Sequence, residues 1–107
     1  MPSTAASTLT ELDLYDNLIA HIKGLDALTH LTSLDLSFNK IKHIKRLNHL
    51  TSLRDLYFVQ NKISVIENLS GLSNLRQIEL GANRIRESCY NHQGNYVKVF
   101  QPTYPFD

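Results

Sequence analysis

Several features common in other protein classes are rare or missing in this chain of 107 residues. It has one cysteine, Cys89, so no internal disulfide can form, and a reducing, intracellular setting is favoured. The formal net charge is only +1, which gives no overall attraction for nucleic acid or an anionic membrane. No apolar run approaches the roughly 20 residues of a membrane helix. The N-terminus has no basic segment followed by an apolar one, so no signal peptide is predicted.

Residue patterns that support catalysis or metal binding are also lacking. The four glycines are not clustered, so no phosphate-binding loop is predicted. Cys89 and His92 form C-x-x-H, which is half a zinc site without a second pair, and no third group orients them as a nucleophile and base. Four histidines are predicted on solvated surface or at unit junctions: His21, His43, His30 and His49. We therefore predict no enzyme activity, metal, cofactor or small-molecule substrate.

The sequence does contain a repeat with a step of 22 residues. Units begin at Leu9, Leu31, Leu53 and Leu75, and the shared pattern is L-x-x-L-x-L-x-x-N-x-I-x-x-I-x-x-L-x-x-L-x-x. The three full units fill every framework position with the expected residue type. Such agreement excludes a chance origin of the repeat. Repeat positions are counted from the first leucine of each unit.

The spacing of the repeat predicts a fold. L-x-L has a period of two, which is typical of a short strand with one buried face. The asparagine at position nine ends each strand, where its amide can bond exposed backbone groups, so a ladder is predicted from Asn17, Asn39, Asn61 and Asn83. The second half has a period of three, which suits a 3₁₀ or short helical return. The unit is identified as a leucine-rich repeat: an α/β solenoid with parallel strands on the concave face and these returns on the convex face.

The repeats define the expected domain boundaries. Residues 1–8 are an N-terminal flanking segment, and residues 9–87 hold the repeats. Residues 88–107 keep no framework position in register and contain Pro102 and Pro105, so they are interpreted as a divergent tail, partly ordered or a substituted cap. Within this tail "YVKVF" is a candidate short strand covering the edge of the last unit. The chain resembles a piece of a longer array, since solenoids usually need caps.

The side chains at positions three, five, seven and eight are predicted to line the concave face. Along the stack, position three holds Glu11, Ser33, Asp55 and Gln77, and position five holds Asp13, Asp35, Tyr57 and Glu79. Position seven holds Tyr15, Ser37, Val59 and Gly81, and position eight holds Asp16, Phe38, Gln60 and Ala82. Six of the ten acidic residues fall in these columns and no lysine or arginine does, so the face is predicted to bind a basic partner protein.

The runs "LDLYDN", "LDLSFNKI", "QNKISVIENLSGLSNL" and "IELGANRIR" resemble the leucine-rich-repeat regulatory subunit of protein phosphatase 1 over residues 9–87. The resemblance implies a non-catalytic subunit that holds the phosphatase catalytic subunit on its concave face. It also implies contacts from position five, namely Asp35, Tyr57, Glu79 and then Asp13. The chain departs from this family in two respects: the later units are missing, and the tail is unlike the family's C-terminal cap.

The repeat alone is also compatible with other functions. The same framework occurs in cytoskeletal or dynein-associated adaptors, and a repeat fragment without independent activity is a further alternative. A secreted bacterial adhesin is disfavoured by the missing signal peptide. The prediction is therefore a protein-binding scaffold, with protein phosphatase 1 as the first candidate partner.

Overall fold

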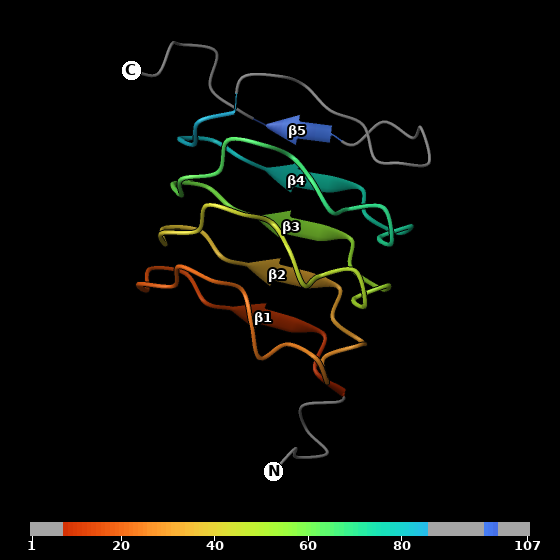
Figure 1. Ribbon diagram of the computed structural model, residues 1–107. Coiled ribbons are helices and arrows are strands. Elements are labelled where there is room, and N and C mark those ends of the chain that lie inside the picture. Colours follow the sequence, from red (N-terminus) through yellow and green to blue (C-terminus); the bar gives the residue numbers. More distant parts are fainter. Residues whose placement is uncertain (1–7, 86–97, 101–107) are drawn as a thin grey trace.

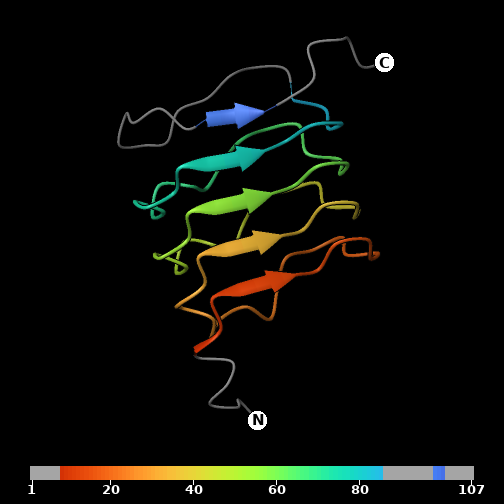
Figure 2. The ribbon, with the colours of Figure 1, turned by 180° about the vertical axis from the view of Figure 1, so that it is seen from behind.

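Positions three to five of each unit, which include the first leucine of L-x-L, form a strand of three residues in the computed structural model, which describes residues 8–85 and 98–100 (Figure 1). The strands are β1 (Glu11–Asp13), β2 (Ser33–Asp35), β3 (Asp55–Tyr57), β4 (Gln77–Glu79) and β5 (Lys98–Phe100). They make one parallel sheet in chain order. Figures 1 and 2 show the strands stacked one above another, with the return segments as a second layer beside them.

The register of the sheet follows the repeat. Leu12 pairs with Leu34, Leu34 with Leu56, and Leu56 with Ile78. The last strand falls within "YVKVF", the candidate edge-covering strand, and Ile78 pairs with Val99, 21 residues further on. The tail segment thus pairs where the next unit of the array would stand, although it has lost the framework residues.

The core lies between the two layers. Alternation along each strand turns position four inward, so Leu34, Leu56 and Ile78 are fully buried, while their neighbours at positions three and five face outward. The leucines and isoleucines of the returns complete one continuous apolar cluster. In the first unit Leu9, Leu12, Leu14 and Ile19 are only partly buried, because no described unit packs against their outer side.

The returns differ in one respect from the prediction. Hydrogen bonds of the 3₁₀ type do form, from Leu28 N to Leu25 O at 3.1 Å and from Leu31 N to Leu28 O at 3.2 Å, and the next two units repeat them. They occur once every three residues, whereas a 3₁₀ helix needs them at consecutive residues. The described returns are therefore pairs of single turns instead of short helices. Within residues 8–85 and 98–100, no helix is long and apolar enough to cross a membrane.

Two left-handed corners in each of the first three units fold the chain into its coil. At position eight the backbone φ is positive in Asp16, Phe38, Gln60 and Ala82. At position sixteen it is positive in Gly24, Arg46 and Asn68. Side chains other than glycine and asparagine are disfavoured in this conformation by roughly 1–2 kcal/mol per residue. The stacking of the units therefore imposes a backbone conformation that is intrinsically unfavourable for several of these residues.

The asparagine at position nine joins neighbouring units. Asn61 donates from Nδ2 to the carbonyl of Phe58 in its own unit at 3.1 Å and to that of Leu36 in the unit before at 2.9 Å. Its Oδ1 accepts the backbone N–H of Ile41, also in the unit before, at 2.9 Å. The same scheme recurs at the buried Asn39 and Asn83. Asn17 is exposed and bonds only carbonyls of its own unit.

Candidate functional site

The outward side chains at positions three and five form a surface that we call the strand face. The register places Asp13 beside Asp35, Asp35 beside Tyr57 and Tyr57 beside Glu79. The second column of the strand face runs Glu11, Ser33, Asp55 and Gln77. All eight residues are exposed or half-buried. Neighbouring parallel strands are roughly 4.8 Å apart, so the carboxylates of Asp13 and Asp35 repel one another across β1 and β2.

The carboxylates of Asp13 and Asp35 also cap the chain where their strands end. Asp13 Oδ1 accepts the N–H of Tyr15 at 2.9 Å, and Asp35 Oδ1 accepts the N–H of Ser37 at 2.9 Å. At β3 the residue in this column is Tyr57, which cannot cap, and Ser37 Oγ of the previous unit accepts the N–H of Val59 instead, at 3.0 Å. Any short side-chain acceptor performs this task, so the cap explains a polar residue but not a charged one.

The prediction that Ser37 lines the exposed surface is wrong. Its side chain is only 4% exposed because the strands end at position five and the chain turns inward at position seven. Tyr15 at the same position of the first unit stays 49% exposed. The difference follows from the side chains, since a serine fits into the corner as a hydrogen-bond acceptor and a tyrosine does not.

Substitutions at Asp35 are expected to separate the cap from the charge. Asp35→Ala removes the acceptor for the N–H of the buried Ser37 and should lower the free energy of unfolding by about 1–2 kcal/mol. Asp35→Asn keeps an acceptor oxygen and relieves the repulsion with Asp13, so stability should change by less than about 0.5 kcal/mol. Urea unfolding followed by circular dichroism measures both. Equal stability of the two variants would show that the cap contributes nothing.

One carboxylate of the strand face is neutralised by a residue outside it. Arg76, at position two of the fourth unit, donates from Nε and Nη2 to the two oxygens of Asp55 at 3.2 and 3.3 Å. This ion pair raises the pKa of the Arg76 guanidinium, which stays charged. The repeat columns did not reveal this pairing, because it joins different repeat positions in neighbouring units. Asp55 is therefore less available to a partner than Asp13 or Asp35.

Tyr57 lies in the middle of the strand face. Burial raises the pKa of its phenol above the ordinary value, and the carboxylates of Asp55, Glu79 and Asp35 raise it further. The hydroxyl therefore keeps its proton and can donate a hydrogen bond at neutral pH. Glu79 accepts a hydrogen bond from Gln77 Nε2 at 2.9 Å, which fixes its carboxylate at the edge of the column.

Tyr15 and Phe38 meet at the corner that follows the first two strands. Their ring centroids are 5.0 Å apart and the rings are tilted by 53°. Both rings are large and exposed, Tyr15 by 49% and Phe38 by 41%. The third residue predicted there, Asp16, is exposed, and its N–H bonds the carbonyl of Ser37 at 3.0 Å, which ties the two corners together.

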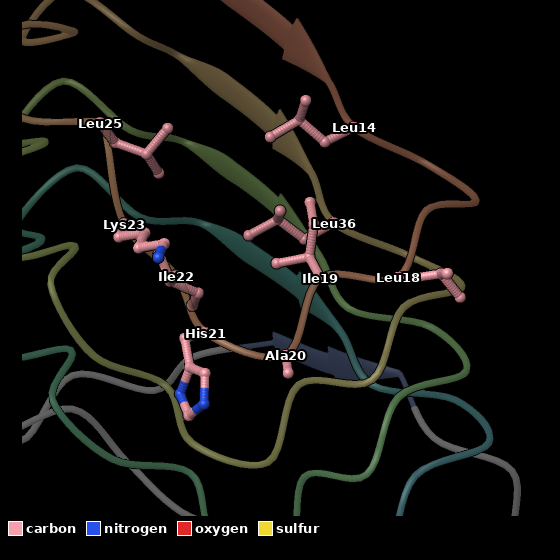
Figure 3. A pocket seen from close by; sticks show the side chains of 9 residues that line it. All are labelled: Leu14, Leu18, Ile19, Ala20, His21, Ile22, Lys23, Leu25 and Leu36. Atoms are coloured by element: carbon pink, nitrogen blue, oxygen red, sulfur yellow. The ribbon is translucent and has the colours of Figure 1, made fainter.

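Two hollows on the described surface are candidate ligand sites. The larger, about 400 Å³, is lined by Leu14, Leu18, Ile19, Ala20, His21, Ile22, Lys23, Leu25 and Leu36 (Figure 3). It is the open end of the core, since Ile19 is only partly buried there, whereas the corresponding Ile41 of the second unit is fully buried. A smaller hollow of about 320 Å³ lies on the strand face between Glu11, Leu12, Asp13, Ser33, Asp35 and Tyr57. Its polar lining and outward direction suit partner binding.

Two of the described histidines contact other residues. His43 lies 3.6 Å from Glu67 on the exposed return, and a ring nitrogen of His49 lies 2.9 Å from the carbonyl oxygen of Leu25. Among the described residues, no three His, Cys, Asp or Glu side chains form a group that could hold a metal ion. Cys89 and His92, the C-x-x-H pair, fall outside the described part of the chain.

Comparisons with known proteins agree with this geometry. The leucine rich repeat family profile matches residues 30–85, just over half of the chain. An internalin, InlF, from Listeria monocytogenes is 35% identical with a TM-score of 0.70, over 77% of this chain and 24% of its own. Internalin C2 from the same organism is 33% identical with a TM-score of 0.74, over 88% of this chain and 41% of its own.

The functional domain of InlJ, also from Listeria monocytogenes, has a TM-score of 0.67 over 92% of this chain, and at 23% identity it supports the fold alone. This chain spans less than half the length of the internalins it matches. No significant match was found among curated proteins.

Proposed function

Because the chain belongs to the leucine-rich repeat family, we propose that it is a non-catalytic scaffold that binds a partner protein through its strand face. The observation that carries the proposal is the placement of charge. Asp13 and Asp35 lie side by side in the sheet, and within the described residues neither has a cation within ion-pair distance. Such an arrangement costs stability, whereas a basic partner would turn the repulsion into attraction.

Most basic residues lie at positions away from the strand face, although Arg76 pairs with Asp55 and Lys98 stands in register with Gln77. Position ten, after the ladder asparagine, carries Lys40, Lys62 and Arg84, and the returns carry Lys23, Lys42, Lys45 and Arg46. A chain with nearly balanced total charge thus presents one acidic side. This segregation favours a defined orientation of the partner and a fast, salt-dependent association.

The partner we propose first is the catalytic subunit of protein phosphatase 1, which this chain would hold as a regulatory subunit, or part of one, in the nucleus or cytoplasm. Support comes from the position-five residues, an acidic column interrupted by the aromatic Tyr57, and from the run "NKISVIENLS", both of which resemble the phosphatase regulator. The single cysteine is compatible with that setting.

The test is binding of the full chain to purified phosphatase catalytic subunit, measured by calorimetry at low and high salt. Asp35→Asn, which preserves the cap, should weaken binding about tenfold and reduce its salt dependence. Asp26→Asn is the matched control, because it removes the same charge from an exposed site in the first return. A folded wild-type chain that does not bind, or equal effects of the two variants, would contradict the proposal.

A further inference from the structure

The aromatic residue at position 38 is not explained by folding. Phe38 has a backbone φ of 60°, in the left-handed region where a bulky side chain is disfavoured. The same corner is occupied by Asp16, Gln60 and Ala82 in the other units, so the fold does not require an aromatic ring there. The ring is also 41% exposed. Phe38 therefore exposes an apolar ring at a corner where the other three units have a smaller or polar side chain.

Phe38 and Tyr15 together present two exposed ring faces to solvent, tilted by 53° to one another. Their rings are in contact at 5.0 Å, yet neither is covered by the core. The Tyr15 hydroxyl forms no hydrogen bond to another residue of the described chain. A partner side chain could therefore reach both the ring faces and the hydroxyl without displacing anything.

Two carboxylates lie close to this aromatic pair along the chain. Asp13 is fixed beside Tyr15 by its bond to the Tyr15 N–H, and Asp35 is fixed just before Phe38 by its bond to the Ser37 N–H. Each cap uses only Oδ1, which leaves Oδ2 for a ligand. The same two carboxylates line the hollow of about 320 Å³ on the strand face. Lys40, two residues after Phe38 in the sequence, makes no ion pair with any described carboxylate.

A ligand for this surface must be cationic, flat and able to donate several hydrogen bonds. An arginine side chain meets all three requirements, because its guanidinium stacks on aromatic faces and presents donors in a planar fork that matches carboxylates. A lysine ammonium has the charge but not the flat face. We propose that the Tyr15–Phe38 pair, with Asp13 and Asp35, binds an arginine side chain of the partner protein. This inference rests on the proposed function, since it specifies the partner residue that the strand face recognises.

The test compares two glycine-spaced peptides that differ only in carrying two arginines or two lysines, titrated into the full chain at low salt and followed by NMR. The wild type should bind the arginine peptide about fivefold more tightly. Phe38→Asn removes the ring and places in the left-handed corner a residue that tolerates it, so the fold should stay intact while the preference for arginine disappears. Gln60→Asn makes the corresponding change one unit further on and should keep the preference.

No preference in the wild type, a preference that persists in Phe38→Asn, or its loss in Gln60→Asn would each overturn the proposal. The thermal midpoint of Phe38→Asn should equal or exceed that of the wild type, which separates lost binding from lost structure. Failure of the phosphatase to bind would contradict the proposed partner but leave the peptide result unaffected, so the two proposals fail independently.

Discussion

Asn61→Ala is expected to lower the free energy of unfolding by about 3–5 kcal/mol, more than any substitution on the strand face. The buried N–H of Ile41 has the amide oxygen of Asn61 as its acceptor and would lose it. The carbonyls of Leu36 and Phe58 would each lose one hydrogen bond but keep another, because Asn39 also donates to Leu36 and Asn83 also donates to Phe58. The expected cost is therefore one full desolvation penalty plus two weakened acceptors. A domain of this size has only about 5–15 kcal/mol to lose.

Asn17→Ala is the matched control for this prediction. Asn17 occupies the same repeat position, but it is exposed and its amide oxygen accepts no backbone N–H from a described unit. Its loss should cost less than about 1 kcal/mol. Urea unfolding of both variants and the wild type gives the comparison. Similar effects at the two positions would mean that contacts between units add little to the ladder.

Phe58→Ala is the second substitution expected to have a large effect, with a loss of about 3–5 kcal/mol. Phe58 is fully buried at position six, where the neighbouring units have Leu36 and Leu80. Removing the ring leaves a cavity in the middle of the stack, where layers on both sides limit collapse. The measurement is the midpoint of thermal unfolding together with the urea-derived free energy.

Phe58→Leu provides the control, because it restores the residue type that the repeat uses at this position. Its cost should be near 1 kcal/mol, since most of the apolar volume is retained. If alanine and leucine were equally destabilising, the aromatic shape of Phe58 would matter instead of its volume.

Much of the fold could be predicted from the sequence because the same residue pattern recurs in several units. A single L-x-L could be a strand or part of a helix, but four copies at a constant step leave only a stack of parallel strands. The inward direction of Leu34 and the outward direction of Asp35 follow from the same alternation.

The corners were less predictable because their conformation comes from stacking and not from local preference. Gly24 and Asn68 at position sixteen are typical of a left-handed residue, but Arg46 at the same position conceals the pattern. At position eight none of the four residues is glycine, so nothing in the sequence indicated the positive φ of Phe38. The return turns were overestimated as helices for a related reason, since a period of three fits both.

The repeat positions predicted which residues form the strand face, but they did not predict the side-chain contacts that these residues make. The columns give the identity of each neighbour, but they do not show that Arg76 reaches Asp55 or that Tyr15 touches Phe38. Both contacts join different repeat positions across units and depend on side-chain length and corner geometry. A comparison of positions two and three, or seven and eight, in neighbouring units could have revealed them.

The bonding of each asparagine to the layer directly before it has a consequence for how such proteins change over generations. Every ladder bond described above joins neighbours only, and the register advances by one constant step. Duplication or deletion of one whole unit in the gene would therefore leave all local contacts in place and alter the length of the acidic surface by one strand spacing, roughly 4.8 Å. The reach of the surface can thus change stepwise without a redesign of any single layer.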